Sequence, residues 1–146
     1  MPQNGLILLV LGITLAGLTL YELTMGNNSN PGSPLSVAQV YALALAAGFS
    51  GTNAVIATAI AFAESGGNPN AQGDYGDPIA GQYNAFGLWQ INTGENPSYA
   101  GQNLFDPATN AAAAYAIAEG GDYFSRWSTY ASGAYQQFVS QVEAVL

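Results

Sequence analysis

The residue types in this chain limit the chemistry that it can perform. Its 146 residues include no cysteine and no histidine, which excludes thiolate nucleophiles, thiolate zinc sites and the usual neutral-pH base. We therefore expect any catalysis to use carboxylates, hydroxyls and amides, with no cofactor and no metal ion.

Glu64 is the carboxylate with the most apolar sequence surroundings. It ends the apolar segment AVIATAIAFAE at residues 54–64. If this segment is a helix, burial among neighbours such as Ile60 and Phe62 disfavours the charged form, and so does the negative end of the helix dipole. A carboxyl group with a raised pKa suits a general acid working near neutral pH. On position alone, however, a helix-end glutamate that points into water is the commoner arrangement.

The charge balance indicates what kind of ligand the chain binds. Nine acidic residues face a single basic one, Arg126, for a net charge of −8, while charged residues make up 7% and aromatic residues 12% of the chain. We expect no nucleic-acid partner, because phosphate recognition depends on lysine and arginine. An uncharged ligand with hydroxyls, amides and apolar ring faces, such as a sugar, fits better. For Arg126 we favour a salt bridge over a substrate carboxylate.

The elements that must position these residues are mainly α-helical. Caps and glycine stops predict four helices, at residues 37–47 after Ser36, 54–64 after Thr52 or Asn53, 108–121 after Asp106-Pro107, and about 134–145. A long polar segment, roughly residues 68–104, separates the second helix from the third, and loops of this length are usually functional. Its one apolar run, FGLWQI at 86–91, predicts a strand or a buried turn.

The N-terminus predicts a membrane anchor. The run from Gly5 to Tyr21 carries no charge and would span roughly 26 Å as a helix. We favour a retained anchor over a cleaved signal peptide, because no basic region precedes the run. The predicted organisation is a transmembrane anchor at 1–25, a flexible linker at 26–34 and a catalytic domain at 35–146. The flanks contain no lysine or arginine that would orient the anchor.

Three motifs carry a family resemblance. They are ESGGNPNA at 64–71, FGLWQIN at 86–92, and DPATN at 106–110 with Tyr115 after it. In this order they resemble the soluble lytic transglycosylase and goose-type lysozyme superfamily, over about Ser36 to the C-terminus. A fourth element, Tyr130 in WSTYASGAY, is similar to the family's Tyr-Asn-Ala-Gly element, with Ala131 and Ser132 in place of Asn and Ala.

The resemblance implies a lysozyme-like fold and an acid role for Glu64. In that family the matching glutamate protonates the glycosidic oxygen between N-acetylmuramic acid and N-acetylglucosamine. Positions matching substrate-contacting residues are Ser65, Gln90, Tyr115 and Tyr130, with Trp89 as a further stacking candidate. Alternatives stay open: Ser65 as a helix-end residue bonded to backbone, and Tyr115 as a core aromatic. For Trp89 the core position is slightly favoured.

A second carboxylate would decide the reaction. Asp74 and Asp77 both follow the Glu64 helix. We prefer Asp77 as a water-activating base, since goose-type lysozymes carry an aspartate at about that separation, although an aspartate before Pro78 is also an ordinary turn residue. Without such a base, the muramoyl 6-hydroxyl attacks internally and leaves a 1,6-anhydro ring. We favour this lytic transglycosylase route over hydrolysis.

The combined hypothesis is an enzyme that opens the bacterial wall locally. Its expected partners are peptidoglycan glycan strands, a lipid bilayer through residues 5–23, and proteins of a virion or of an envelope-spanning complex. The expected location is a virion membrane or a bacterial inner membrane, as a single-pass protein with its domain facing the wall. The alternatives are a hydrolytic goose-type-like lysozyme and a non-catalytic glycan-binding or structural virion membrane protein.

Overall fold

The computed structural model describes residues 33–75 and 82–146. The predicted anchor at 1–25, most of the linker at 26–34 and the candidate base Asp77 lie outside these ranges. Within them, no helix has the length and apolar character needed to cross a membrane.

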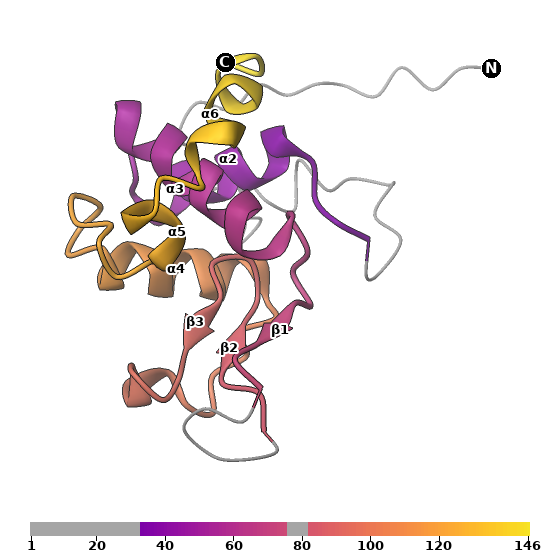
Figure 1. Ribbon diagram of the computed structural model, residues 1–146, viewed down its shortest axis with the longest axis vertical. Coiled ribbons are helices and arrows are strands. Elements are labelled where there is room, and N and C mark those ends of the chain that lie inside the picture. The colour runs from indigo at the N-terminus through magenta and orange to yellow at the C-terminus, as the bar shows by residue number, and fades with distance from the viewer. Residues whose placement is uncertain (1–32, 76–81) are drawn as a thin grey trace, which may run out of the picture.

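The described fold is mainly helical with one small sheet, as predicted. The helices gather at one end of the molecule and the strands at the other (Figure 1). The helices are α2 (Val37–Ala47), α3 (Gly51–Ser65), α4 (Pro107–Ile117), α5 (Ser128–Ala131) and α6 (Gln136–Glu143), with a 3-10 turn, η1 (Pro97–Tyr99). The strands are β1 (Gln72–Gly73), β2 (Ala85–Phe86) and β3 (Ile91–Asn92).

Local signals set two helix starts as predicted. Ser36 and Gln39 form a capping box at α2, in which Ser36 Oγ accepts from Gln39 N at 3.3 Å and Gln39 Oε1 accepts from Ser36 N at 2.9 Å. Asp106 Oδ2 accepts from Thr109 N at 2.8 Å at the start of α4, with Pro107 in the first turn. Gly48 ends α2 in the left-handed conformation, at φ 118°.

Other boundaries differ from the predictions. The N-cap of α3 is Ser50, and the predicted caps Thr52 and Asn53 lie inside the helix. The Asn53 side chain instead donates from Nδ2 to Asp122 Oδ1 at 2.8 Å. Helix α4 ends at Ile117 instead of continuing to residue 121, since the chain turns at Glu119, where φ is 54°. The predicted last helix, at about 134–145, corresponds to α6, and an additional short helix, α5, precedes it, with Gly133 between the two at a φ of 80°.

The polar segment after α3 contains the sheet. The three strands pair antiparallel in the order β1-β2-β3, with Gly73 opposite Ala85 and Ala85 opposite Asn92. Paired residues share a face, so Gly73, Ala85 and Asn92 lie on one side of the sheet. The run FGLWQI is the end of β2, a turn and the start of β3, which fits the buried-turn alternative.

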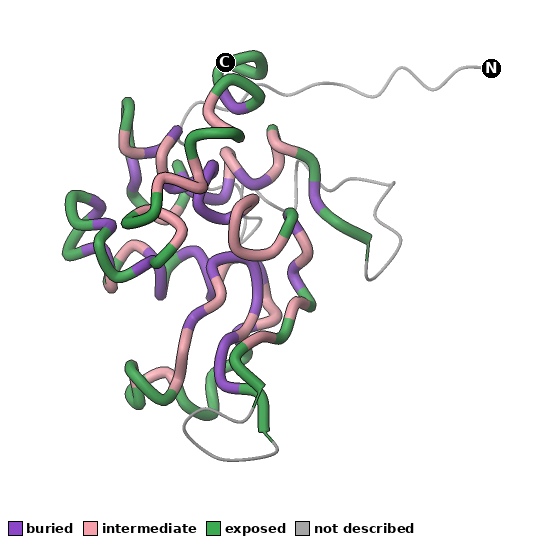
Figure 2. Tube along the Cα trace, viewed as in Figure 1, coloured by how far each residue is buried: buried purple, intermediate pink, exposed green. Residues whose placement is uncertain are grey.

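Asn110 joins this turn to the helical half. Its side chain is fully buried and accepts from Trp89 N while donating to Phe86 O and Leu104 O, each at 2.9 Å. Gly87 lies directly against it, and a Cβ at this position would collide with the Asn110 amide. Figure 2 shows buried positions continuing from the helices into β2 and β3. Asn110 therefore holds the strands in a fixed place relative to α4.

Candidate active site

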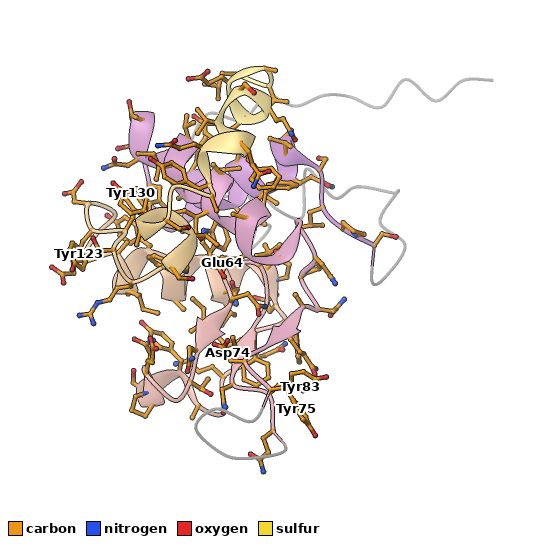
Figure 3. All side chains as sticks on the ribbon, viewed as in Figure 1. Glu64, Asp74, Tyr75, Tyr83, Tyr123 and Tyr130 are labelled. Carbon is orange, nitrogen blue, oxygen red and sulfur yellow. The ribbon has the colours of Figure 1, made fainter. Side chains whose placement is uncertain are left out.

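Glu64 lies where the helices meet the sheet. It occupies the last turn of α3, is half-buried, and is labelled between the helical half and the strands in Figure 3. Thr129 of α5 donates from Oγ1 to Glu64 Oε1 at 2.6 Å. A short bond of this kind to a carboxylate oxygen holds the side chain in one orientation.

The surroundings raise the pKa of Glu64 above its ordinary value. Burial is the largest cause, and the negative charge of Asp74 acts in the same direction, while the Thr129 hydrogen bonds oppose both by favouring the ionised form. The direction predicted from the apolar helix is confirmed. A carboxyl group with a raised pKa keeps its proton to higher pH and can donate it to a leaving oxygen.

Asp74 is the described carboxylate that acts on Glu64. Asp74 follows β1 and has a φ of 53°. In a regular strand its side chain would point to the face opposite that of Gly73, but this left-handed backbone conformation departs from strand geometry. Its Oδ2 accepts from Asn92 Nδ2 at 2.9 Å, and its carbonyl oxygen accepts from Asn84 Nδ2 at 3.4 Å. The preferred candidate, Asp77, lies outside the described residues, so its role stays a prediction.

Gln90 adds an amide to this side of the sheet. It closes the turn after Gly87 with a φ of 46°, and its Nε2 donates to Gly87 O at 3.0 Å. A Cβ on Gly73 would collide with Gln90 Oε1, so the Gln90 amide lies directly over the Gly73 backbone. Gln90 thus places a neutral amide on the side of the sheet that carries Asp74, which suits N-acetyl and hydroxyl groups. The Asn92 amide already donates to Asp74 and accepts from the backbone N–H groups of Gly94 and Glu95.

The sequence of the domain matches one known family. Residues 41–129 match the family described as a lysozyme-like domain, over more than half of the chain. The chain belongs to this family. Comparisons with curated proteins and with solved structures returned no match. The family match supports the superfamily resemblance and a peptidoglycan-acting glycosidase class.

Two residues of the lysozyme-like domain that were predicted to contact substrate, Ser65 and Tyr130, make other contacts. Ser65 donates from Oγ to Ala61 O of its own helix at 2.9 Å, the backbone-bonded arrangement. Tyr130 is next to Thr129, but its ring packs 5.0 Å from that of Tyr135 and is labelled apart from Glu64 in Figure 3. Neither side chain is placed as a direct partner of the acid by these contacts.

Tyr115 lies at the wrong end of α3 to reach the acid. Its ring packs against Gly48 and makes an edge contact with Phe49, at 5.1 Å between centroids. Gly48 precedes the first turn of α3, whereas Glu64 is in its last turn, a separation of roughly 20 Å along the helix. These contacts place the Tyr115 ring away from Glu64 and fit the core alternative for this position.

Trp89 belongs to the core of the lysozyme-like domain. It is 1% exposed, and its Nε1 donates to Ala57 O at 2.8 Å. Its own carbonyl oxygen accepts from Trp127 Nε1 at 2.8 Å. The ring offers no free face to a sugar, which corrects the substrate-stacking role and agrees with the slightly favoured core position.

Sequence reasoning missed Thr129 and Asn92. Thr129 adjoins the Tyr130 element, and Asn92 ends the FGLWQIN motif, so both lie within recognised motifs without being singled out. In the part of the chain that the structure describes, no group of three or more acidic residues is arranged to hold a metal ion. The described site contains carboxylates, a hydroxyl and amides.

Proposed function

We propose that this lysozyme-like domain is a lytic transglycosylase that cleaves the β-1,4 bond between N-acetylmuramic acid and N-acetylglucosamine in peptidoglycan. The observation that carries the proposal is Glu64, half-buried with a raised pKa and held by Thr129 Oγ1. Such a group keeps its proton to higher pH than an ordinary glutamate and is oriented before substrate binds.

The proposed reaction uses one acid/base residue. Protonated Glu64 donates its proton to the glycosidic oxygen as the bond to C1 of the muramic residue breaks. The muramoyl 6-hydroxyl then attacks C1, and the Glu64 carboxylate accepts the hydroxyl proton, which restores the acid. The products are a free N-acetylglucosamine 4-hydroxyl and a 1,6-anhydromuramoyl end. Gln90 supplies an amide that can orient an N-acetyl group.

Hydrolysis is the second candidate, and Asp74 is the observation that favours it. Its charge acts on Glu64, and Asn92 holds its Oδ2 at 2.9 Å. A carboxylate in this position could activate water for attack at C1 and give a reducing end. Asp77 remains an alternative for the same step.

Product analysis separates these reactions. The full chain is incubated with purified sacculi, and the soluble muropeptides are analysed by mass spectrometry. Products that end in 1,6-anhydromuramic acid support the transglycosylase, and reducing ends support hydrolysis. Folded protein that releases neither product would refute the enzymatic proposal and leave the non-catalytic glycan-binding alternative.

The proposed biological role is local wall opening, during phage entry or assembly of an envelope-spanning machine. It rests on the sequence run at residues 5–21, which predicts that the domain is tethered to a membrane facing the wall.

A further inference from the structure

A hollow of about 340 Å³ lies beyond β3, beside the C-terminal end of α4. Its lining includes Glu95, Asn96, Tyr99, Ile117, Glu119 and Arg126. A smaller pocket shares Glu95 and Arg126 with it and reaches Gln90 and Asn92. The hollow therefore adjoins a second pocket whose lining includes Gln90 and Asn92 of the candidate active site.

The hollow carries charges of both signs in a chain that has few charges. Arg126 is the only lysine or arginine among the 146 residues, and its side chain is exposed, with the guanidinium carbon 5.9 Å from the centroid of the Tyr123 ring. Glu95 and Glu119 are exposed carboxylates that line the same space. A ligand that offers a carboxylate and an ammonium group would complement this lining, whereas an uncharged glycan would use neither.

The hollow is also close to the proposed acid. Arg126 precedes Thr129 by three residues, so their Cα atoms are at most about 10 Å apart even in an extended chain. Thr129 in turn is bonded to Glu64 at 2.6 Å. Arg126 is therefore close along the chain to the residue that holds the proposed acid.

We propose that this hollow binds the peptide stem of peptidoglycan, with Arg126 on a stem carboxylate and Glu95 and Glu119 facing the ammonium group of its diamino residue. The inference rests on the proposed function, which supplies the muramic residue from which the stem extends. It makes Arg126 a specificity residue that distinguishes peptide-bearing glycan from bare glycan.

The test compares glycan strands that carry stems with strands stripped by a muramoyl-alanine amidase. Binding is measured with the full chain carrying Glu64→Gln, and turnover with native Glu64. Arg126→Gln should weaken binding to peptide-bearing strands roughly tenfold and leave bare strands nearly unchanged, since one charge-assisted contact is lost. The affinity of Arg126→Lys for peptide-bearing strands should lie between those of Arg126 and Arg126→Gln. Glu95→Gln should weaken binding only to peptide-bearing strands whose diamino residue has a free amino group. The matched control is Glu143→Gln on α6.

The outcomes separate the inference from the proposed function. An equal loss on both strands, no loss on peptide-bearing strands, or no binding to them at all would overturn the stem site. A protein that binds peptide-bearing strands through Arg126 but cuts neither strand would refute the enzymatic proposal and keep the stem site.

Discussion

Thr129 and Glu64 are 65 positions apart in the sequence, yet Thr129 Oγ1 donates to Glu64 Oε1 across 2.6 Å. The bond connects the short helix α5 to the last turn of α3. It favours the ionised carboxylate, whereas burial and the charge of Asp74 favour the protonated form. The pKa of Glu64 is raised because burial and the charge of Asp74 together outweigh the hydrogen bonds from Thr129.

Replacing Thr129 with valine should move the activity profile to higher pH. The substitution removes a hydrogen bond that lowers the pKa of Glu64, so the pKa rises and the acid keeps its proton to higher pH. The basic limb of the kcat/KM profile should shift upward, and kcat/KM at the optimum should fall roughly tenfold because the acid is less well oriented. Thr129→Ser, which keeps the hydroxyl, is the control. An unchanged basic limb in Thr129→Val would show that this bond does not act on the catalytic acid.

Asp74→Asn should move the same limb in the opposite direction. Removing the negative charge removes an effect that raises the pKa of Glu64, so the acid loses its proton at lower pH. The products also matter: a transglycosylase should continue to give anhydro ends, while a hydrolase that uses Asp74 should lose its reducing ends. A shift of the basic limb to higher pH would contradict the electrostatic assignment.

Glu64→Gln should stabilise the fold near neutral pH. A raised folded-state pKa means that the contribution of Glu64 to stability is present below its unfolded pKa and is lost as pH rises through the folded pKa. The glutamine side chain cannot ionise, so the Tm difference should favour the variant at pH 7 and disappear below about pH 4. Thermal unfolding across this range tests it, with the exposed Glu143→Gln as control. A lower Tm than native at pH 7 would count against a destabilised carboxylate.

Asn110→Ala should destabilise the junction between the sheet and α4. The substitution leaves Trp89 N, Phe86 O and Leu104 O without their buried partner, at a cost of about 3 kcal/mol. Urea unfolding measures the change. Ala112→Ser, at an exposed position on the same helix, should change stability by less than about 0.5 kcal/mol. Similar values for the two variants would mean that Asn110 does not hold the turn.

Features that depend on nearby residues could be predicted from the sequence. The Ser36 and Asp106 caps act on backbone groups within one turn, and the apolar residues that precede Glu64 predicted the direction of its pKa shift. The motif from Phe86 to Asn92 also identified the turn that carries Gln90. These signals were sufficient for the mainly helical fold, the lysozyme-like family and the choice of Glu64 as the candidate acid.

Features that depend on long-range packing could not be predicted in this way. Tyr115 has the right residue type for the site, but it packs against the end of α2 and not beside Glu64. Thr129 has no distinctive local pattern, and only the position of α5 against α3 brings its hydroxyl to the acid. Asp77 was preferred to Asp74 because its separation from Glu64 matches goose-type lysozymes. The left-handed φ of Asp74 and its bond from Asn92 are not indicated by its neighbours or its spacing.

The most direct test of the central claim compares the native chain with Glu64→Gln on purified sacculi, at equal concentration and with matched circular dichroism spectra. We predict that the native chain releases soluble muropeptides and that the variant releases them at least about 100-fold more slowly, since a positioned general acid contributes that much or more. Release by folded Glu64→Gln at the native rate would contradict the assignment of Glu64 as the catalytic acid.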